Sequence, residues 1–333
     1  MGTMDFSDLA RLASGHVEAR MIQASVQLGL FDCIGDQALD AAQVAAALRT
    51  DLRATELLLN SLTALSLIEK KGEQFSLSTP AKTYLLANSP NSLCGMIRFD
   101  ASLWNCWEGL ADAVRGGKPA RPADMYQETP AETETFIQAM DSLVKARGDA
   151  EVLANTLDWN QEVTDLLDIG SGPATYPIHL CRRYPKFRAT IFDLPGTLKI
   201  TERYVREAQL ESRIKLVSGD YRNDPIPGRH DAIFLSNIIH GEGYDENQRL
   251  MTKLAANLNA GGRVIIKDHI LDETRANPPV GAIFSLLMLL TTASGRCYSF
   301  NEVKSWLENA GLSRVRQIDL PPPLTSSLII GEK

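Results

Sequence analysis

The sequence predicts an α/β protein in which a mostly parallel, doubly wound sheet follows an α-helical domain. Two domains are expected from the 333 residues, since one domain typically takes roughly 100–200 residues. Three helical patterns and a hairpin pattern fill the first 78 residues. From residue 165 onward, short and nearly unbroken apolar runs alternate with helical stretches, which is typical of parallel strands covered by helices on both faces.

The first domain is predicted to have the pattern of a winged helix. Apolar residues recur at helical spacing over 9–30, over 40–49, where Asp40 is the expected N-cap, and over 55–68. Two short strand patterns within 67–78 then flank a polar turn at Lys71-Gly72-Glu73 and indicate a β-hairpin. Such an arrangement serves either as a DNA-binding module or as a dimerisation platform.

The charge distribution argues against nucleic acids and membranes as partners. The formal net charge is −7, and residues 1–160 hold 13 Lys and Arg against 21 Asp and Glu. An acidic protein has no general attraction to phosphate backbones or anionic lipid surfaces. The longest apolar run, residues 282–290, is far shorter than the ~20 residues that span a bilayer.

The cysteines and histidines indicate neither disulfides nor a metal site. Five cysteines without a C-x-x-C pair fit neither a disulfide framework nor structural zinc. The five histidines are scattered without metal-ligand spacing, so we expect no metal. Because the first residues also lack the pattern of a secretory signal, we expect a cytoplasmic protein.

Residues 111–160 are predicted to link a domain at 1–110 to the sheet domain at 161–333. Trp104 and Trp107 lie three residues apart, on one face of a predicted helix. A long amphipathic helix is expected over Pro130–Leu157, with Met140 on its apolar side. The tryptophans and Met140 suit either the core or a ligand-binding surface.

The predicted sheet domain contains five apolar runs that read as buried strands, at 165–170, 189–194, 214–220, 231–237 and 263–268. Two further strands, at 315–320 and 324–332, are joined by a short proline segment without a helix between them. They are therefore expected to form an antiparallel pair at the edge of the sheet. In doubly wound sheets, ligands bind outside the carboxyl ends of the strands, so the residues after each run are the candidates for ligand contact.

The turn after the first run contains Asp168, Gly170 and Gly172. These glycines permit a tight turn and a close approach of the backbone to a ligand. Thr175 replaces the third glycine of a dinucleotide motif, which weakens a pyrophosphate interpretation. The negative charge of Asp168 instead suits a ligand that carries an ammonium or sulfonium group.

The next two runs also end in carboxylates. Asp193 is placed to accept hydrogen bonds from two ribose hydroxyls, and its alternative role is that of a helix cap, because Pro195 suits the start of the following helix. Asp220 suits an adenine amino group, and the Tyr221 ring is suited to cover the base. The alternative for Asp220 is a carboxylate that stabilises its own turn.

A histidine and a carboxylate follow the fourth and fifth runs. His240 comes after the strand at the predicted switch point and is a candidate general base. Asp268 is a candidate for holding the imidazole ring and stabilising its charged form. The alternatives are a surface or core histidine and an ordinary carboxylate at the end of a strand.

Taken in order, the segments LLDIGSGPATY, FDLP, SGDY, the histidine after the fourth strand and GGRVIIKD resemble the S-adenosylmethionine-dependent small-molecule O-methyltransferases of plants and bacteria. The resemblance runs from QLGLFD near the N-terminus to AGL at 310–312. It implies a winged-helix-like domain for homodimerisation, a Rossmann-like class I methyltransferase domain with an antiparallel edge strand, S-adenosyl-L-methionine as cofactor and S-adenosyl-L-homocysteine as product.

The resemblance also implies roles for individual residues. His240 matches the catalytic base and Asp268 the residue that orients it. The positions expected at the cofactor are Asp168, Gly170, Gly172, Asp193, Leu194, Asp220, Tyr221 and Ser236. Those expected at the substrate, a small and largely apolar aromatic or polyketide-like molecule, are Trp107, Met140, Met288 and Cys297.

Several positions depart from the family pattern. Gly241-Glu242 follows the histidine where many relatives have Asp-Trp, and Ser236 replaces a lysine that touches the cofactor in plant members. Cys297 replaces a second orienting glutamate, and Ser285 replaces an acidic residue of the chamber helix. These departures leave the acceptor atom open between oxygen, carbon and nitrogen. A cofactor-sensing, DNA-binding regulator is the remaining alternative.

Overall fold

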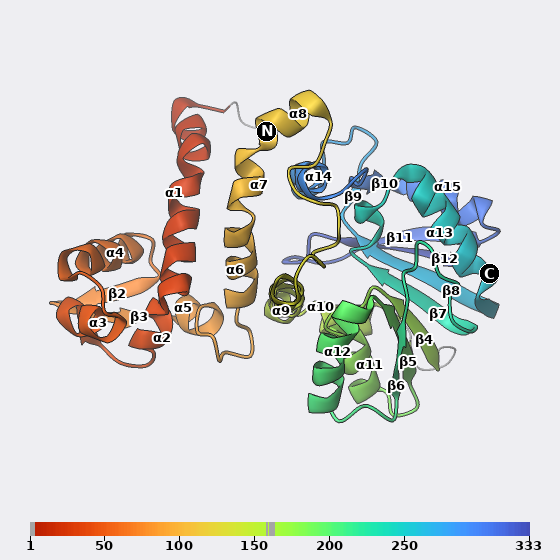
Figure 1. Cartoon of the computed structure of the whole chain (residues 1–333), viewed down its shortest axis with the longest axis horizontal. Helices are drawn as coiled ribbons and strands as arrows, with labels where there is room; N and C mark the ends of the chain where they lie inside the picture. Colours follow the sequence, from red (N-terminus) through yellow and green to blue (C-terminus); the bar gives the residue numbers. More distant parts are fainter. Residues whose placement is uncertain (1–3, 158, 160–163) are drawn as a thin grey trace. The chain divides into compact units, whose positions relative to one another are not determined.

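The computed structural model describes residues 4–157, 159 and 164–333. The chain forms two compact units (Figure 1). The first comprises Met1–Leu103 with Gln138–Ala146, and the second comprises Trp104–Ile137 with Arg147–Lys333. Helix α9, Pro130–Arg147, contributes residues to both units.

The first unit contains the predicted helices and hairpin. Its elements are α1 (Phe6–Leu28), α2 (Leu30–Ile34), β1 (Leu39–Asp40), α3 (Ala41–Leu48), α4 (Leu52–Ala64), β2 (Ile68–Lys71), β3 (Gln74–Leu77), α5 (Thr79–Tyr84) and α6 (Cys94–Ser102). Asp40 caps α3 as expected, in a capping box with Gln43. The predicted hairpin is confirmed, because β2 pairs antiparallel with β3, and β1 extends the sheet on the other side of β3.

Helix α1 carries apolar side chains that the chain itself leaves uncovered. The core of the first unit forms around Leu30, Phe31, Leu59 and Leu62, which are fully buried. Along α1, by contrast, the exposed large apolar residues are Phe6, Leu9, Leu12, Val17 and Leu28. Such a row of exposed apolar residues is typical of a helix that packs against another molecule.

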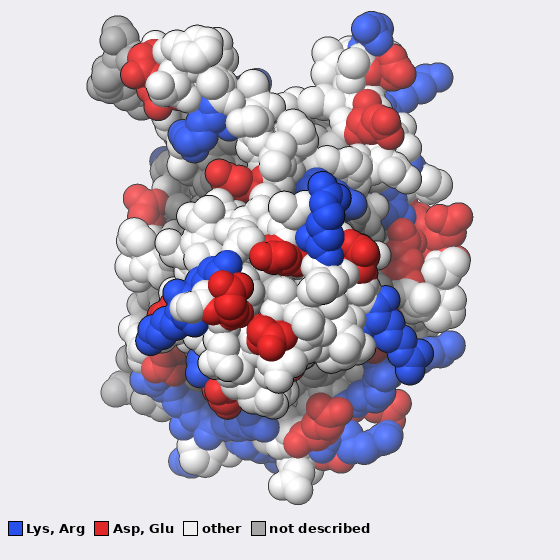
Figure 2. Space-filling view, turned by 90° about the vertical axis from the view of Figure 1, so that its left-hand side faces the viewer, with Lys and Arg blue, Asp and Glu red and all other residues white. Residues whose placement is uncertain are grey.

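Figure 2 shows one face of the molecule, on which basic side chains gather mainly toward the lower edge. In the middle of that face, acidic and basic side chains lie among wide uncharged areas, and no broad basic surface gathers there. Among the described residues, no helix combines the length and apolar composition that crossing a membrane requires.

The second unit is built on a seven-stranded sheet with the order β11-β12-β8-β7-β4-β5-β6. The strands are β4 (Asp165–Ile169), β5 (Arg188–Asp193), β6 (Ile214–Ser218), β7 (His230–Ser236), β8 (Leu258–Asp268), β11 (Ser313–Asp319) and β12 (Ser327–Glu332). All five predicted parallel strands are confirmed. The predicted antiparallel pair also lies at the edge, where β11 is the outermost strand and β12 runs antiparallel to both of its neighbours.

Helices cover both faces of this sheet, with α11 and α12 on one side and α13 and α15 on the other (Figure 1). The remaining short strands β9 and β10 pair with each other in parallel. The further elements are α7 (Trp104–Glu108), α8 (Leu110–Gly116), α10 (Asp149–Thr156), α11 (Thr175–Arg183), α12 (Pro195–Glu207), η1 (Ile239–Gly241), α13 (Tyr244–Ala256), β9 (Ile270–Leu271), α14 (Pro279–Thr291), β10 (Tyr298–Ser299) and α15 (Phe300–Asn309).

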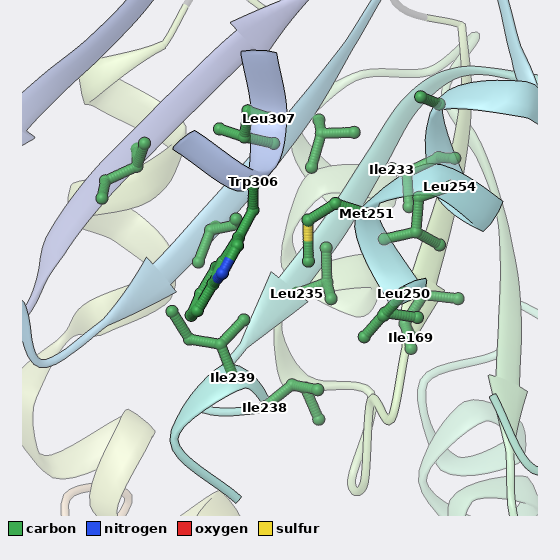
Figure 3. Packing of buried hydrophobic residues seen from close by; sticks show 14 of the residues in the cluster. Ile169, Ile233, Leu235, Ile238, Ile239, Leu250, Met251, Leu254, Trp306 and Leu307 are labelled. Atoms are coloured by element: carbon green, nitrogen blue, oxygen red, sulfur yellow. The ribbon is translucent and has the colours of Figure 1, made fainter. Parts of the chain in front are cut away.

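The largest core of the second unit lies between the sheet and the helices α13 and α15. Met251 from α13 and Trp306 from α15 are fully buried there, together with Leu235 of β7 (Figure 3). Ile238 and Ile239 extend this core to the turn that follows β7. The core therefore fixes the position of the turn that carries His240.

The prediction of one helix over 130–157 is wrong. Gly148 adopts a left-handed backbone conformation with φ of 72°, which ends α9 at Arg147 and starts α10 at Asp149. Glycine enters this conformation without steric cost, so it separates two helices whose apolar patterns run on as if continuous.

A group of charged residues lies buried beneath this break, within the second unit. Asp149 receives hydrogen bonds from Arg147, at 2.9 and 3.0 Å, and forms an ion pair with Lys267 of β8 at 2.9 Å. Asp149 and Lys267 are almost wholly buried, with 0% and 1% of their surfaces exposed. Burial lowers the pKa of Lys267, although the neighbouring Asp149 charge acts in the opposite direction.

We predict that Asp149→Ala lowers the free energy of unfolding by about 3–5 kcal/mol, because it leaves the Lys267 ammonium group buried without a carboxylate. All four tryptophans lie in this unit, so chemical denaturation followed by tryptophan fluorescence measures its stability. The control is Glu202→Ala, which breaks an exposed ion pair with Arg206 and should cost less than about 1 kcal/mol. Equal small losses in both variants would contradict the prediction.

Candidate functional site

His240 and Asp268 lie together at the carboxyl ends of two neighbouring strands. His240 belongs to the short 3-10 turn after β7, and Asp268 is the last residue of β8. The Nδ1 atom of His240 lies 2.7 Å from Oδ1 of Asp268. Both side chains are buried, with 9% of His240 and 0% of Asp268 exposed. The two residues singled out as base and orienting acid are therefore in hydrogen-bond contact.

The environment of Asp268 keeps its carboxyl group ionised. Burial alone would raise the pKa of Asp268, but the charge of His240 and its hydrogen bond lower it overall. The backbone N–H of His269 also donates to Oδ1, at 2.8 Å. Because a carboxylate only accepts hydrogen bonds, Nδ1 of His240 carries the proton in this pair.

Two residues that the sequence analysis did not single out shape the surroundings of His240. The Phe284 ring of α14 lies edge-to-face with the imidazole, with 4.8 Å between the ring centroids. A Cβ atom on Gly295 would lie 2.3 Å from the backbone oxygen of His240, so only glycine fits at this position. The sequence shows Gly295, but the residues around it do not indicate that it packs against the turn that carries His240.

The turn after β4 comes close to the turn that carries His240. Gly170 and Gly172 both adopt positive φ, at 63° and 59°, as the sequence predicted for a tight turn. A Cβ atom on Gly170 would lie 2.5 Å from Cδ1 of Ile238. The glycine therefore allows the ends of the adjacent strands β4 and β7 to approach each other closely.

Asp168, at the end of β4, is a buried carboxyl group with no cationic partner among the described residues. Only 1% of its surface is exposed, and its contact is with the hydroxyl of Ser171, which donates a hydrogen bond at 2.6 Å. Burial raises the pKa of Asp168 to about 8, and the nearby Asp193 charge raises it further against the Ser171 hydrogen bond. A cation brought to this position would favour the ionised form.

Asp193, at the end of β5, holds the glycine turn in place. Its Oδ2 accepts a hydrogen bond from the backbone N–H of Gly172 at 2.9 Å, and its Oδ1 accepts one from Leu194 at 2.7 Å. Burial raises the pKa of Asp193 to about 6. Leu194, and not Asp193, is the N-cap residue of α12, whose first turn begins at Pro195 as expected.

Asp220 and Tyr221 lie in the loop after β6. Asp220 accepts hydrogen bonds from the Arg222 backbone and from the Asn223 side chain, both at 2.9 Å, so it stabilises its own turn as the alternative interpretation required. The Tyr221 hydroxyl donates to Glu242 at 2.7 Å. Glu242 entered the sequence analysis only as a departure from the family pattern, and its contact with this loop was not foreseen.

The predicted substrate-binding residues are not all gathered in one unit. Trp107 of α7, Met288 of α14 and Cys297 belong to the second unit, whereas Met140 belongs to the first. Met288 and Cys297 are buried, but 36% of Trp107 is exposed. Burial raises the pKa of Cys297 to about 12, so this residue is a neutral thiol where relatives place an acid.

The carboxyl groups at this edge of the sheet fit a cationic nucleoside. Asp168, Asp193 and Asp220 follow three adjacent strands, and in the described part of the chain none of the three forms an ion pair. Ser236 ends β7, on the other side of β4. Three carboxyl groups and a hydroxyl therefore lie at the ends of four neighbouring strands.

One acidic group in the described residues has metal-ligand spacing. It consists of Asp124, Glu128 and Glu132, whose carboxylates approach one another within 4.8 Å. Arg121 already forms ion pairs with Asp124, at 3.2 Å, and with Glu132, at 2.6 Å. The negative charge of this acidic group is therefore partly balanced. None of the residues around His240 belongs to the group.

Comparison with known proteins identifies relatives over almost the whole chain. The 3-hydroxy-5-methyl-1-naphthoate 3-O-methyltransferase of Streptomyces sahachiroi is 29% identical, covering 98% of this chain and 94% of the relative. The tetracenomycin polyketide synthesis 8-O-methyl transferase of Streptomyces glaucescens is also 29% identical, covering 98% and 96%. The crystal structure of human N-acetylserotonin methyltransferase in complex with S-adenosylmethionine is 25% identical, covers 100% and 99% of the two chains, and has a TM-score of 0.89.

Two family models match the two parts of the chain. The O-methyltransferase dimerisation domain matches residues 10–87, and the O-methyltransferase domain matches residues 107–313. The second match alone covers more than half of the chain. The chain therefore belongs to the O-methyltransferase family and is an S-adenosylmethionine-dependent methyltransferase.

Proposed function

We propose that the enzyme methylates a hydroxyl group of a small, largely apolar molecule and that His240 is the general base. The observation that carries this proposal is the 2.7 Å contact between Nδ1 of His240 and the ionised Asp268. With the proton on Nδ1, the lone pair of Nε2 is free to accept the proton of a hydroxyl group. Asp268 then stabilises the positive charge that the imidazole gains.

The cofactor is proposed to lie along the strand ends from β7 to β6. Bound S-adenosylmethionine supplies a methyl group on a positively charged sulfur, which is a strong leaving group. Asp168 balances positive charge, Asp193 accepts from the ribose hydroxyls, and Asp220 accepts from the adenine amino group. The backbone at Gly170, Gly172 and Leu194 follows the cofactor closely, while Tyr221 and Ser236 border it.

The acceptor is proposed to be a flat aromatic or polyketide-like molecule. Two relatives, by their names, act on a naphthoate and in tetracenomycin polyketide synthesis, which supports this class. Phe284 places an aromatic ring against His240, and Trp107, Met288 and Cys297 offer apolar surface in the same unit. Met140, which belongs to the first unit, stays a predicted substrate-binding residue.

A carbon or nitrogen acceptor is the second candidate. It is favoured by Cys297, whose buried thiol is neutral and so replaces an acid of the family pattern with a group that carries no charge. An acceptor that is already nucleophilic needs alignment more than a strong base, and alignment alone supplies up to about 7–11 kcal/mol. Mass and NMR analysis of the product identifies the methylated atom and separates the two candidates.

A homodimer is proposed through the first unit. The matching dimerisation family model covers residues 10–87, and the exposed apolar residues of α1 begin at Phe6 and end at Leu28. Two such helices packed together would remove the apolar face from water, at roughly 25 cal/mol for each Å² buried.

We predict that His240→Ala lowers kcat about 10²–10⁴-fold while the affinity for S-adenosylmethionine stays close to the wild-type value. The substitution removes the proton acceptor but leaves the carboxylates of the cofactor site intact. The measurements are turnover with the hydroxynaphthoate named for the Streptomyces sahachiroi relative and isothermal titration calorimetry with the cofactor. Parallel losses of turnover and affinity would show that His240 is not specifically a base.

Asp268→Asn, which keeps the shape of the side chain, should also lower kcat.

We predict that S-adenosylmethionine binding at pH 7 releases close to one proton. The pKa of Asp168 is raised to about 8, so the free enzyme holds this carboxyl group mostly protonated, and a positive charge beside it favours ionisation. Affinity should therefore rise with pH up to about 8. Calorimetry in two buffers of different ionisation enthalpy counts the protons. The control is Asp168→Asn, in which the release should vanish, and an unchanged release there would rule out Asp168 as its source.

We predict that the double substitution Leu9→Glu and Leu12→Glu converts the enzyme from a dimer to a monomer. Both leucines are exposed on α1, and two buried carboxylates at each position would oppose association. Light scattering at micromolar concentration gives the mass. Lys71→Glu, on the exposed end of β2, adds the same charge elsewhere and should leave the dimer intact. A dimeric double variant would exclude this face of α1.

A further inference from the structure

Glu242 is a buried carboxylate that reaches from the histidine turn to the loop after β6. It lies two residues after His240, and 5% of its surface is exposed. Its Oε1 accepts a hydrogen bond from the Tyr221 hydroxyl at 2.7 Å. The same oxygen accepts from the Arg222 guanidinium, at 2.8 Å from Nε and 2.7 Å from the terminal nitrogen. One carboxylate oxygen thus holds two consecutive residues of this loop.

The backbone of Glu242 is itself held firmly in the core. Its carbonyl oxygen accepts a hydrogen bond from the hydroxyl of Tyr298 in β10 and a longer one, at 3.4 Å, from Asn247. The Asn247 side chain, from α13, also donates to the backbone oxygen of Ile239 at 2.8 Å. The Asn247 side chain therefore holds the backbone on both sides of His240.

The loop held by Glu242 is also attached to α13. Lys253 of α13 donates to the backbone oxygens of Tyr221 and Asp224, each at 2.7 Å. This contact fixes the path of the backbone but does not reach the histidine turn. The Glu242 carboxylate instead joins the side chains of Tyr221 and Arg222 to that turn by hydrogen bonds.

The charges and hydrogen bonds of Glu242, Tyr221 and Arg222 favour a fixed connection between the loop after β6 and the histidine turn. Burial, with the neighbouring Glu242 charge, raises the pKa of Tyr221, so its hydroxyl remains a donor. The Arg222 guanidinium balances the buried charge of Glu242. Hydrogen bonds to an ionised acceptor are roughly twice as strong as neutral ones. A shift of the loop would break several of these bonds together.

We propose that Glu242 is a positioning residue that couples the adenine end of the cofactor site to the placement of His240. The proposal rests on the function proposed above, in which Asp220 and Tyr221 border the adenine. The cofactor orders the loop, and through Glu242 the ordered loop holds the histidine turn. Loss of the carboxylate should therefore affect both cofactor affinity and the imidazole, although the residue contacts neither.

The test is Glu242→Gln, which keeps the size of the side chain and removes its charge. We expect S-adenosylmethionine to bind about tenfold more weakly by calorimetry, which corresponds to the loss of one or two charge-assisted hydrogen bonds. We also expect the ring NMR signal of His240, identified by its absence in His240→Ala, to move or broaden in the cofactor-bound enzyme. Turnover with the hydroxynaphthoate at saturating cofactor should fall several-fold. The NMR and binding measurements need no acceptor.

Glu302→Gln is the matched control. Glu302 is also a largely buried carboxylate paired with an arginine, Arg296 at 2.7 Å, but it has no contact with the loop after β6. Its substitution should lower the melting temperature without weakening cofactor binding or moving the His240 signal. If both variants change both readouts equally, the effect is general destabilisation and the proposal is overturned. If Glu242→Gln weakens cofactor binding but leaves the His240 signal unchanged, the coupling is likewise overturned.

Tyr221→Phe keeps the test decisive if Glu242→Gln does not fold. It removes only the hydroxyl that donates to Glu242. Cofactor affinity should fall by about threefold or less, and the His240 signal should move in the same direction as in Glu242→Gln. An unchanged His240 signal in this variant would overturn the proposal. A wild-type enzyme that binds no S-adenosylmethionine would instead overturn the function proposed above, which distinguishes the two failures.

Discussion

The close approach of the turns after β4 and β7 is the constraint on which the site depends. Gly170 leaves room for Ile238, since a Cβ atom there would lie 2.5 Å from the isoleucine. Ile238 and Ile239 are in turn buried in the core between the sheet and α13 and α15. The position of His240 is thus set by apolar packing on one side and by a glycine turn on the other, while Asp268 adds orientation.

The proposed cofactor site and the proposed base share one edge of the sheet. Parallel strands end at the same edge, so residues from β4, β5, β6, β7 and β8 meet there although they are far apart in sequence. The switch in strand order falls between β4 and β7. Carboxylates gather on one side of that switch, at β4 to β6, and the histidine–aspartate pair gathers on the other, at β7 and β8. In the proposed function, charge balance and proton transfer therefore fall to separate halves of the edge.

The sequence was sufficient for features that depend on local pattern. Buried parallel strands are nearly unbroken apolar runs, so their ends, including Asp168, Asp193 and Asp268, are predictable from the order of residues alone. The break at Gly148 was missed because a single glycine barely disturbs an amphipathic pattern. The Glu242 contacts were missed for a different reason: its partners lie 20 and 21 residues away, and only the folding of the sheet, with β6 as an edge strand, brings them together.

The buried charges of the second unit separate into two kinds, and the difference has a physical meaning. Asp149 is paired with Arg147 and Lys267, and Glu242 is paired with Arg222, so each has its compensation within the chain. Asp168 has no such partner in the described part of the chain, and burial raises its pKa to about 8. A buried carboxyl group without compensation lowers stability once it ionises. A positive charge that arrives with a ligand would supply the compensation that Asp168 lacks.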